Sequence, residues 1–425
     1  MSIELRERLF AELDAIRLID PHSHISPLQP TAATFADLLG YHYYTELAHS
    51  AGMPRDRIEQ PGISPQEKVG RLVEWLFTLD NTIQVSWLVE LSRRFFGFQE
   101  DQITPQNWQS LFDRSAAIIN QPDWPRQVLQ LSNVEAVFLT NDFDDPLEGF
   151  DTRVFVPCLR TDDLVFHLPK PSVRKRLERA AKISIHNSSD LHNAIGTLFE
   201  HFTRKGARAC AISLPPDFAP ARPEAVDDAV HKWLAQDDAL DAVSRRRLAH
   251  FVFWTLAEFC EDYKLPLDLM IGVTRHVYSG GVHQGQDLFD SRVSLIQYRE
   301  VFNAFGQVIF PISLLASAAN QELSSYAWIF PNVVTNGHWW YSNTPAWIER
   351  DLAARLEAVP RTKQIGYYSD AYKLEFLLPK FAMYKRILAK ILADRYVIDR
   401  HWSESQAIQL GCQLLRGNVE RVFGW

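Results

Sequence analysis

The 425-residue sequence has few cysteines, few charged residues and no long apolar run, and each shortage excludes a class of protein. The four cysteines, Cys158, Cys210, Cys260 and Cys412, are scattered without a close pair, which argues against a disulfide framework or a thiolate zinc site. Charged residues make up only 23% of the chain and hydrophobic residues 46%, so the chain can bury a large core and is not disordered.

Membrane and nucleic-acid partners are also disfavoured. No stretch approaches about 18 uninterrupted apolar residues, so we expect no membrane-spanning helix. A net charge of −8 argues against a nucleic-acid binder or a polybasic membrane surface. The first twenty residues alternate charged and apolar side chains without a cleavable apolar core, so no secretory signal is visible. These features predict a cytoplasmic protein.

Short β-branched or aromatic runs recur along the chain, and polar residues gather at their C-terminal ends. Eight of them are predicted strands, at 15–20, 134–140, 153–160, 207–213, 267–273, 307–314, 332–336 and 364–369. Most gaps between them hold amphipathic helical patterns, such as 230–263 and 345–356. Eight alternating strands and helices, with polar residues after the strands, are typical of an α/β protein with a (β/α)8 (TIM) barrel. A doubly wound sheet would also alternate, but no G-x-G-x-x-G motif follows the first strand.

We therefore expect a single barrel domain over residues 1–425, although the length alone would also allow two or three domains. More than a hundred residues of helical texture follow Asp20, which predicts a helical insertion subdomain over about 30–130, after strand 1. There it could cover the mouth of the barrel. A second helical insertion is expected from about 173 to 205, and a C-terminal helical extension over 394–425.

The sharpest local motif is Asp20-Pro21-His22-Ser23-His24, at the end of the first strand. Residues two apart on a strand face the same side, so His22 and His24 can present both imidazoles to one ion. Asp370 ends the eighth strand, which neighbours the first in a closed barrel. Two imidazoles and a carboxylate suit a divalent metal such as zinc or manganese. However, H-x-H occurs often by chance, and Asp370 could instead cap a helix.

Further motifs follow one another in order along the chain. They are Leu18 to His24, Tyr41-His42-Tyr43, Ala51-Gly52-Met53, Trp87 to Phe98, Asn141 to Pro146, Pro157 to Asp162, Gly337 to Tyr341, Ser369-Asp370 and Tyr384 to Leu388. In this order they resemble the motifs of the uronate isomerases, a branch of the amidohydrolase superfamily. The resemblance implies a barrel of the metal-dependent hydrolase type and isomerisation of a sugar acid.

The resemblance also implies roles for the matching residues. His22, His24 and Asp370 would hold a divalent metal, zinc in first place and manganese as the alternative, with Asp370 also a candidate base. His42 and Tyr43 would contact the substrate and take part in catalysis.

Three further matches would bind the substrate. Arg160 would hold a carboxylate through its bidentate guanidinium, and Trp339 and Trp340 would wall the sugar pocket. Taken alone, the tryptophan pair would more often belong to a core, and Arg160 could be part of a structural ion pair. His42 and Tyr43 alone would be ordinary residues of an amphipathic helix.

Several positions depart from the family's motifs. Tyr372 and Glu46 stand where the family has arginines, and Met270 where it has the histidine of its H-I-G strand. The family's A-S-D-H motif falls on Cys210-Ala211-Ile212. Each change removes a polar or cationic group that could hold a sugar acid. Candidates to compensate are Tyr372, Lys373, Arg275 and His338.

Three functions remain open at this point. The leading hypothesis is aldose–ketose isomerisation of a hexuronate such as D-glucuronate or D-galacturonate. The second is metal-dependent hydrolysis of a lactone or sugar-acid derivative, and the third is a sugar-acid binder without activity.

The small-molecule partner would be anionic, so on an acidic protein its attraction must be local. An aromatic content of 12% is compatible with a homo-oligomer interface.

Overall fold

All eight predicted segments contain a strand in the computed structural model, which describes residues 2–224 and 226–425. The strands are β1 (Leu18–Asp20), β2 (Val134–Phe138), β4 (Phe155–Val156) with β5 (Cys158–Arg160), β6 (Ala209–Leu214), β7 (Leu267–Ile271), β10 (Phe310–Leu314), β11 (Val333–Asn336) and β12 (Gln364–Ile365). A two-residue strand, β3 (Asn141–Asp142), follows β2 and pairs with β5. All pairings within this set are parallel.

The strands pair in chain order. The hydrogen-bonded orders are β1-β2-β4 and β12-β11-β10-β7-β6-β5-β3. Because β4 and β5 are consecutive stretches of one extended segment, 155–160, this segment joins the two groups of strands. The interruption falls at Pro157, which has no N–H to donate to a ladder.

The first and last strands meet through the residues that follow them, and this contact is called the seam here. The backbone N–H of Asp370 donates to the carbonyl oxygen of His22 at 3.1 Å, and that of His24 donates to Ala371 at 2.8 Å. The carboxylate of Asp20 accepts from both the backbone N–H and the hydroxyl of Ser369. The eight parallel strands thus close into the predicted (β/α)8 barrel.

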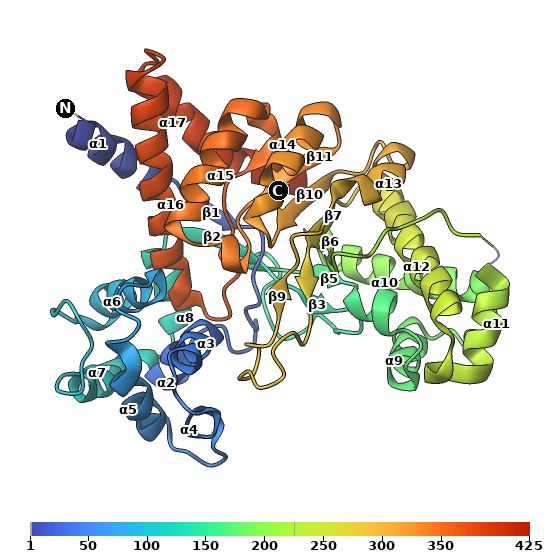
Figure 1. The fold of residues 1–425 in the computed structure, drawn as a ribbon, viewed down its shortest axis with the longest axis horizontal. Helices are drawn as coiled ribbons and strands as arrows, with labels where there is room; N and C mark the ends of the chain where they lie inside the picture. The colour runs from blue at the N-terminus through green and yellow to red at the C-terminus, as the bar shows by residue number, and fades with distance from the viewer. Residues whose placement is uncertain (1, 225) are drawn as a thin grey trace.

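Helices surround the strands, as Figure 1 shows. Those that follow the middle and later strands are α9 (Pro171–Ala181), α10 (Ser188–Arg204), α11 (Val226–Gln236), α12 (Ala242–Tyr263), α13 (Arg299–Ala304), α14 (Asn320–Ile329), α15 (Pro345–Ala358) and α16 (Leu377–Ile391). The chain begins with α1 (Ser2–Asp14) and ends with α17 (Glu404–Cys412) and α18 (Asn418–Phe423). Leu267, Leu269 and Ile271 of β7 join the apolar layer between strands and helices, whereas Asp268 and Met270 do not.

A separate group of helices, called the helical segment here, lies between β1 and β2. It comprises α2 (Phe35–Leu39), α3 (His42–Ser50), α4 (Arg55–Glu59), α5 (Pro65–Leu76), α6 (Ile83–Phe96), α7 (Trp108–Ile119) and α8 (Trp124–Leu131). Most of these helices lie to one side of the barrel, at the lower left of Figure 1. Buried Glu375, just before α16, ties them to the last strand, because it accepts from the backbone N–H of Ala32 and from the indole N–H of Trp124, each at 3.0 Å.

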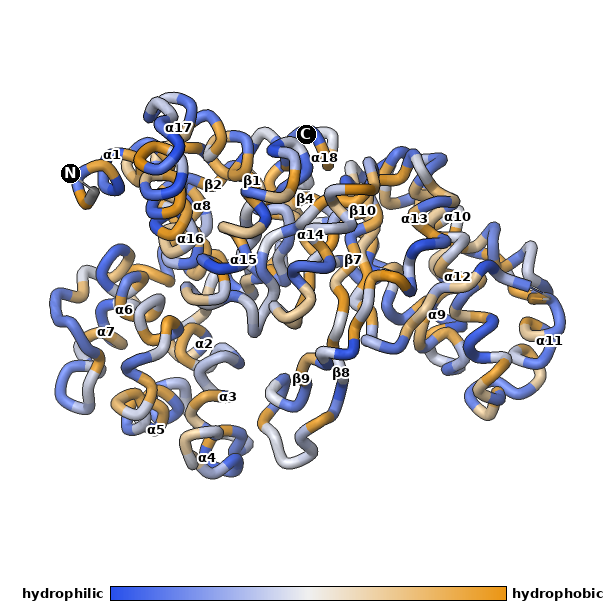
Figure 2. The backbone as a smooth tube through the Cα atoms, turned by 45° about the horizontal axis from the view of Figure 1, so that its top comes forward, coloured by the Kyte–Doolittle hydropathy of each residue, from blue (hydrophilic) through white to orange (hydrophobic). Residues whose placement is uncertain are grey.

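A hairpin that the sequence did not predict follows β7. Its strands, β8 (Val273–Thr274) and β9 (Leu288–Phe289), are antiparallel, and Figures 1 and 2 show it extending from the barrel toward α3 and α4. At its tip, buried Val282 packs into the same apolar core as the helical segment, and the backbone N–H of His283 donates to Glu59. A Cβ at Gly285 would lie 2.6 Å from the Cγ of Glu46, so glycine permits this close approach.

The structure differs from the sequence prediction in two local details. The first strand is shorter than 15–20, because the backbone N–H groups of Ala15 and Ile16 still donate to carbonyl oxygens of α1 and the strand starts only at Leu18. The pattern over 230–263 forms α11 and α12 rather than one helix, since Asp241 caps a new N-terminus by accepting from the backbone N–H groups of Val243 and Ser244. None of the helices described combines the length and apolar character needed to cross a bilayer.

The Glu375 anchor can be tested by unfolding. Replacing Glu375 with Ala would leave the buried donors of Ala32 and Trp124 without their acceptor, at a cost of about 1–3 kcal/mol each. We expect Glu375→Ala to lower the free energy of unfolding by about 3–5 kcal/mol, measured by urea denaturation. Glu90→Ala, which removes only a partly exposed ion pair with Arg386, should cost at most about 1 kcal/mol. Equal losses in the two variants would contradict the anchoring role.

Candidate active site

A cavity of about 210 Å³ opens at the C-terminal ends of the strands, where (β/α)8 barrels carry their sites. It is smaller than the roughly 300–1,000 Å³ typical of pockets for drug-sized ligands, so it suits a small molecule. Its lining residues are His24, His42, Arg160, Ser213, Met270, Arg275, Gln284, Asp287, Trp339, Trp340, Asp370 and Tyr372. The barrel strands, α3 and the hairpin therefore all contribute to it.

His22, His24 and Asp370 meet beside the seam. The Nε2 atoms of His22 and His24 lie 3.6 and 3.3 Å from Oδ1 of Asp370, and one ligand atom from each residue lies within 4.8 Å of the others. Within the described chain, His22 Nε2 and Asp370 Oδ1 are buried without a partner of hydrogen-bond geometry. Converging orphaned atoms of this kind fit a divalent cation, and these three residues could hold one.

Each ring nitrogen of His24 has an oxygen neighbour. The hydroxyl of Thr140 donates to the carbonyl oxygen of Ser23 at 3.2 Å and lies 2.8 Å from Nδ1 of His24. Nε2, on the opposite side of the ring, lies 3.3 Å from Oδ1 of Asp370. With a metal on Nε2, Nδ1 would carry the proton and donate it to the Thr140 hydroxyl.

Burial and local charge fix the ionisation of the cluster. Burial lowers the pKa of His22 to about 3, and burial lowers that of His42 to about 3 as well, so both rings are neutral near pH 7. Burial acts to raise the pKa of Asp370, but the imidazoles of His24 and His22 and the ammonium of Lys380 bring it down to about 2. Asp370 is an anion throughout the physiological range.

Lys380 of α16 is a site neighbour that the sequence patterns did not reveal. It is fully buried, and its ammonium donates to the carbonyl oxygen of Ser369 at 2.8 Å. The same ammonium lies 5.0 Å from the ring centroid of Tyr43 and 5.1 Å from that of Trp87, which are cation–π distances. Lys380 thus links the residue before Asp370 to the helical segment.

His42 and Tyr43 begin α3 and face the cluster. The hydroxyl of Tyr43 donates to Oδ2 of Asp370 at 3.4 Å, and burial raises the pKa of Tyr43, so the phenol stays protonated. The ring of His42 lies edge-on to Tyr372 and Trp340, with centroid distances of 5.3 and 5.9 Å. The structure thus places Tyr43 next to Asp370 and His42 among the aromatic residues of the cavity, while their predicted part in catalysis stays a prediction.

Two arginines bring positive charge to the cavity, and each already has a carboxylate partner. Arg160 donates through Nε to Asp162 at 3.1 Å, and Asp162 also accepts from the backbone N–H of Ser213. Arg275 of the hairpin pairs with Asp287 at 2.6 Å. Because Arg160 uses Nε for Asp162, its two terminal nitrogens remain for a ligand that enters the cavity.

Of the positions that depart from the family's motifs, Tyr372 and Met270 line the cavity, whereas Cys210 and Ile212 belong to the apolar core between strands and helices. Tyr372 stacks on His24 at 4.9 Å and accepts from the side chain of Gln284, and Met270 lines the cavity. Lys373 does not line it, because its ammonium donates to the carbonyl oxygen of Gln29. His338 is buried and also lies outside the lining.

The hairpin supplies two lining residues, Gln284 and Asp287, that sequence reasoning missed. Their segment carries no helical or strand period, so the sequence offers no signal that places it on the cavity. Thr140 is the last residue of the predicted strand 134–140. Its partnership with His24 requires the register of neighbouring strands, which a single sequence does not give.

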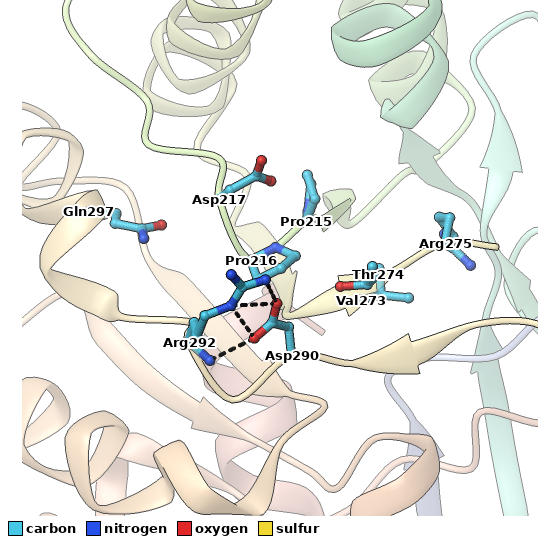
Figure 3. Close-up of a pocket in the computed structure, with 9 residues that line it drawn as sticks. All are labelled: Pro215, Pro216, Asp217, Val273, Thr274, Arg275, Asp290, Arg292 and Gln297. Carbon is cyan, nitrogen blue, oxygen red and sulfur yellow. Dashed lines mark hydrogen bonds and ion pairs between the residues drawn. The ribbon is translucent and has the colours of Figure 1, made fainter. Parts of the chain in front are cut away.

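A larger hollow of about 540 Å³ lies beside the cavity and shares Arg275 with it (Figure 3). Two of its charged residues, Asp290 and Arg292, hydrogen-bond to each other. The chemistry is assigned to the smaller cavity, because His24 and Asp370 of the cluster line that cavity and not the larger hollow.

Comparisons with known proteins agree with the geometry. Residues 1–411 match the family model described as glucuronate isomerase. A uronate isomerase of Brucella melitensis is 23% identical to this chain, with 97% of this chain and 94% of that protein covered. Two solved structures have the same fold: a uronate isomerase from Thermotoga maritima (TM-score 0.90, 18% identity, covering 99% and 97% of the chains) and a glucuronate isomerase from Caulobacter crescentus (TM-score 0.90, 17%, covering 100% and 94%).

Glu46, one turn after His42, should make stability depend on pH. Burial raises its pKa from 4.5 to about 8, against the opposing effect of the Trp340 indole. Its contribution to stability is therefore fully present below about pH 4.5 and is lost as the pH rises through 8. We expect the melting temperature of Glu46→Gln, measured by differential scanning calorimetry, to rise relative to that of the wild type as the pH increases over this range. A difference that does not change with pH would contradict the assignment.

Proposed function

The chain belongs to the glucuronate isomerase family, and from that premise we propose that it interconverts the aldose and ketose forms of a hexuronate such as D-glucuronate or D-galacturonate. The observation that carries the proposal is the cluster of His22, His24 and Asp370, of which His24 and Asp370 line a small cavity that also holds Arg160. A hexuronate has a carboxylate at one end and a carbonyl at the other. The cavity offers a cation for the first and proton-transfer groups for the second.

Arg160 is proposed to bind the substrate carboxylate. Its guanidinium is oriented by Asp162, so part of the entropic cost of fixing this long side chain is met before the substrate arrives. The two terminal nitrogens match the two oxygens of a carboxylate. Arg275 lies on the same cavity and is the second candidate, together with the aromatic walls formed by Trp339, Trp340 and Tyr372.

The reaction requires four proton changes on two neighbouring carbons. On going from aldose to ketose, C2 and its oxygen each lose a proton, while C1 and its oxygen each gain one. Asp370 is proposed as the base or proton relay, because it is ionised and buried at the site. Tyr43, which donates to Asp370 and stays protonated, and neutral His42 are proposed to exchange protons with the sugar oxygens.

A divalent metal held by His22, His24 and Asp370, zinc or alternatively manganese, would supply electrophilic stabilisation of negative charge on the sugar oxygens. The chain's own residues set the rest. Thr140 would accept the Nδ1–H of His24 when Nε2 holds the metal, and the hairpin contributes Gln284 next to Tyr372. The aromatic rings around the cavity reduce access of water, which strengthens the charge interactions inside it.

The activity is tested directly with the intact protein supplied with zinc or manganese. D-Glucuronate and D-galacturonate are incubated with the enzyme in deuterated water, and NMR follows the appearance of the ketose and of deuterium at the transferred position. Turnover of one or both sugars is expected. No turnover of either sugar by metal-loaded protein would overturn the proposal, and hydrolysis of the corresponding lactone instead would favour the hydrolase.

The role of Arg160 predicts a specific kinetic defect. A charge-assisted hydrogen bond contributes about 1.5–3 kcal/mol, so Arg160→Met should raise the KM for the hexuronate roughly 10- to 150-fold with a smaller effect on kcat. Arg292→Met, which removes an exposed arginine paired with Asp290, serves as the control and should leave KM unchanged. A fall in kcat alone in Arg160→Met would argue against carboxylate binding.

A further inference from the structure

The inward face of β7 carries two residues, Asp268 and Met270, one layer apart. Met270 lines the cavity and packs with Trp339 and Tyr368, whereas Asp268 lies deeper in the barrel with only 2% of its surface exposed. A buried carboxylate is costly unless other groups compensate for its charge. The neighbours of Asp268 therefore show what this residue does.

Asp268 contacts one amide and one imidazole. Its Oδ1 accepts from the side-chain amide of Asn336 at 3.2 Å. Its Oδ2 lies 3.8 Å from Nδ1 of His22, while Nε2 on the other side of the same ring lies 3.6 Å from Asp370. The imidazole of His22 is thus held between two buried carboxylates, and the one at Nε2 belongs to the candidate metal cluster.

The two histidines of the cluster are supported differently. Nδ1 of His24 has the neutral hydroxyl of Thr140, whereas Nδ1 of His22 has the carboxylate of Asp268. A ring that ligates a metal through one nitrogen usually donates the other N–H to a carboxylate, a carbonyl or water, which fixes its orientation and increases its basicity. Asp268 is positioned to do this for His22.

We propose that Asp268 is the positioning residue of His22: it accepts the Nδ1–H of the ring and directs the Nε2 lone pair into the cluster with His24 and Asp370. The inference rests on the proposed function in one respect, namely that the cluster binds a divalent metal. The 3.8 Å separation is longer than a hydrogen bond, and the proposal requires it to shorten when Nε2 binds the metal, as hydrogen bonds that are long in unliganded sites commonly do. β7 has Met270 where the family has a histidine, so this strand acts on the cluster through Asp268.

The test compares metal affinity in three intact proteins: the wild type, Asp268→Asn and the control Glu375→Gln. Glu375→Gln also removes a fully buried carboxyl group, but at the anchor of the helical segment rather than near His22. Metal-free samples are titrated with zinc against a chromogenic chelator, and the visible spectrum of the cobalt-loaded proteins is recorded.

We expect Asp268→Asn to weaken zinc binding about 10- to 100-fold and to change the cobalt spectrum, and Glu375→Gln to bind as the wild type does. In the absence of metal, the free energy of unfolding of Asp268→Asn should be no lower than that of Glu375→Gln. Unchanged zinc affinity in Asp268→Asn would overturn the proposal, because it would leave Asp268 as a partner of Asn336 only. A wild type that binds no zinc would overturn it too. A wild type that binds zinc but turns over no hexuronate would overturn the proposed function alone.

Discussion

The contact between the ends of the first and last strands determines where the chemistry of this protein can occur. At the seam, Asp20 accepts two hydrogen bonds from Ser369, and Lys380 donates to the carbonyl oxygen of the same serine. Asp370 follows directly in a left-handed conformation with φ of 51°, which is costly for a residue other than glycine. Because the surrounding contacts over-determine this backbone, the carboxylate is delivered beside His22 and His24, residues that are almost 350 positions away in the sequence.

The alternating strands and helices of the barrel could be predicted from the sequence, whereas the hairpin and the burial of Lys380 could not. Eight β-branched runs separated by helical patterns were sufficient for the barrel, and closure of a barrel is enough to bring the end of strand 8 to the H-x-H motif. The hairpin over 273–289 was missed because its strands have two residues each, too few for a period. Lys380 was missed because a lysine in an apolar helix is normally exposed, and only the carbonyl oxygen of Ser369 and the nearby carboxylates make its burial tolerable.

Electrostatic balance in the cavity is local rather than global. The protein has a net charge of −8, yet the cavity must receive an anion if the proposed function holds. Arg160 and Arg275 line the cavity, and each is restrained by an aspartate, Asp162 or Asp287. Pairing lowers the net positive charge of the cavity but fixes the guanidinium groups in place. Such a site favours a ligand that fits the orientation of these groups over an arbitrary anion.

The hairpin has a consequence for how sites of this kind can diversify. It carries Arg275, Gln284 and Asp287 to the cavity, but it contributes no strand to the barrel and no residue to the His22, His24 and Asp370 cluster. Mutations in this loop can therefore accumulate without disturbing the scaffold, provided that Val282 and Gly285 keep its tip against α3 and α4. Substrate preference can therefore change during evolution through mutations in the hairpin, while the barrel and the cluster are kept.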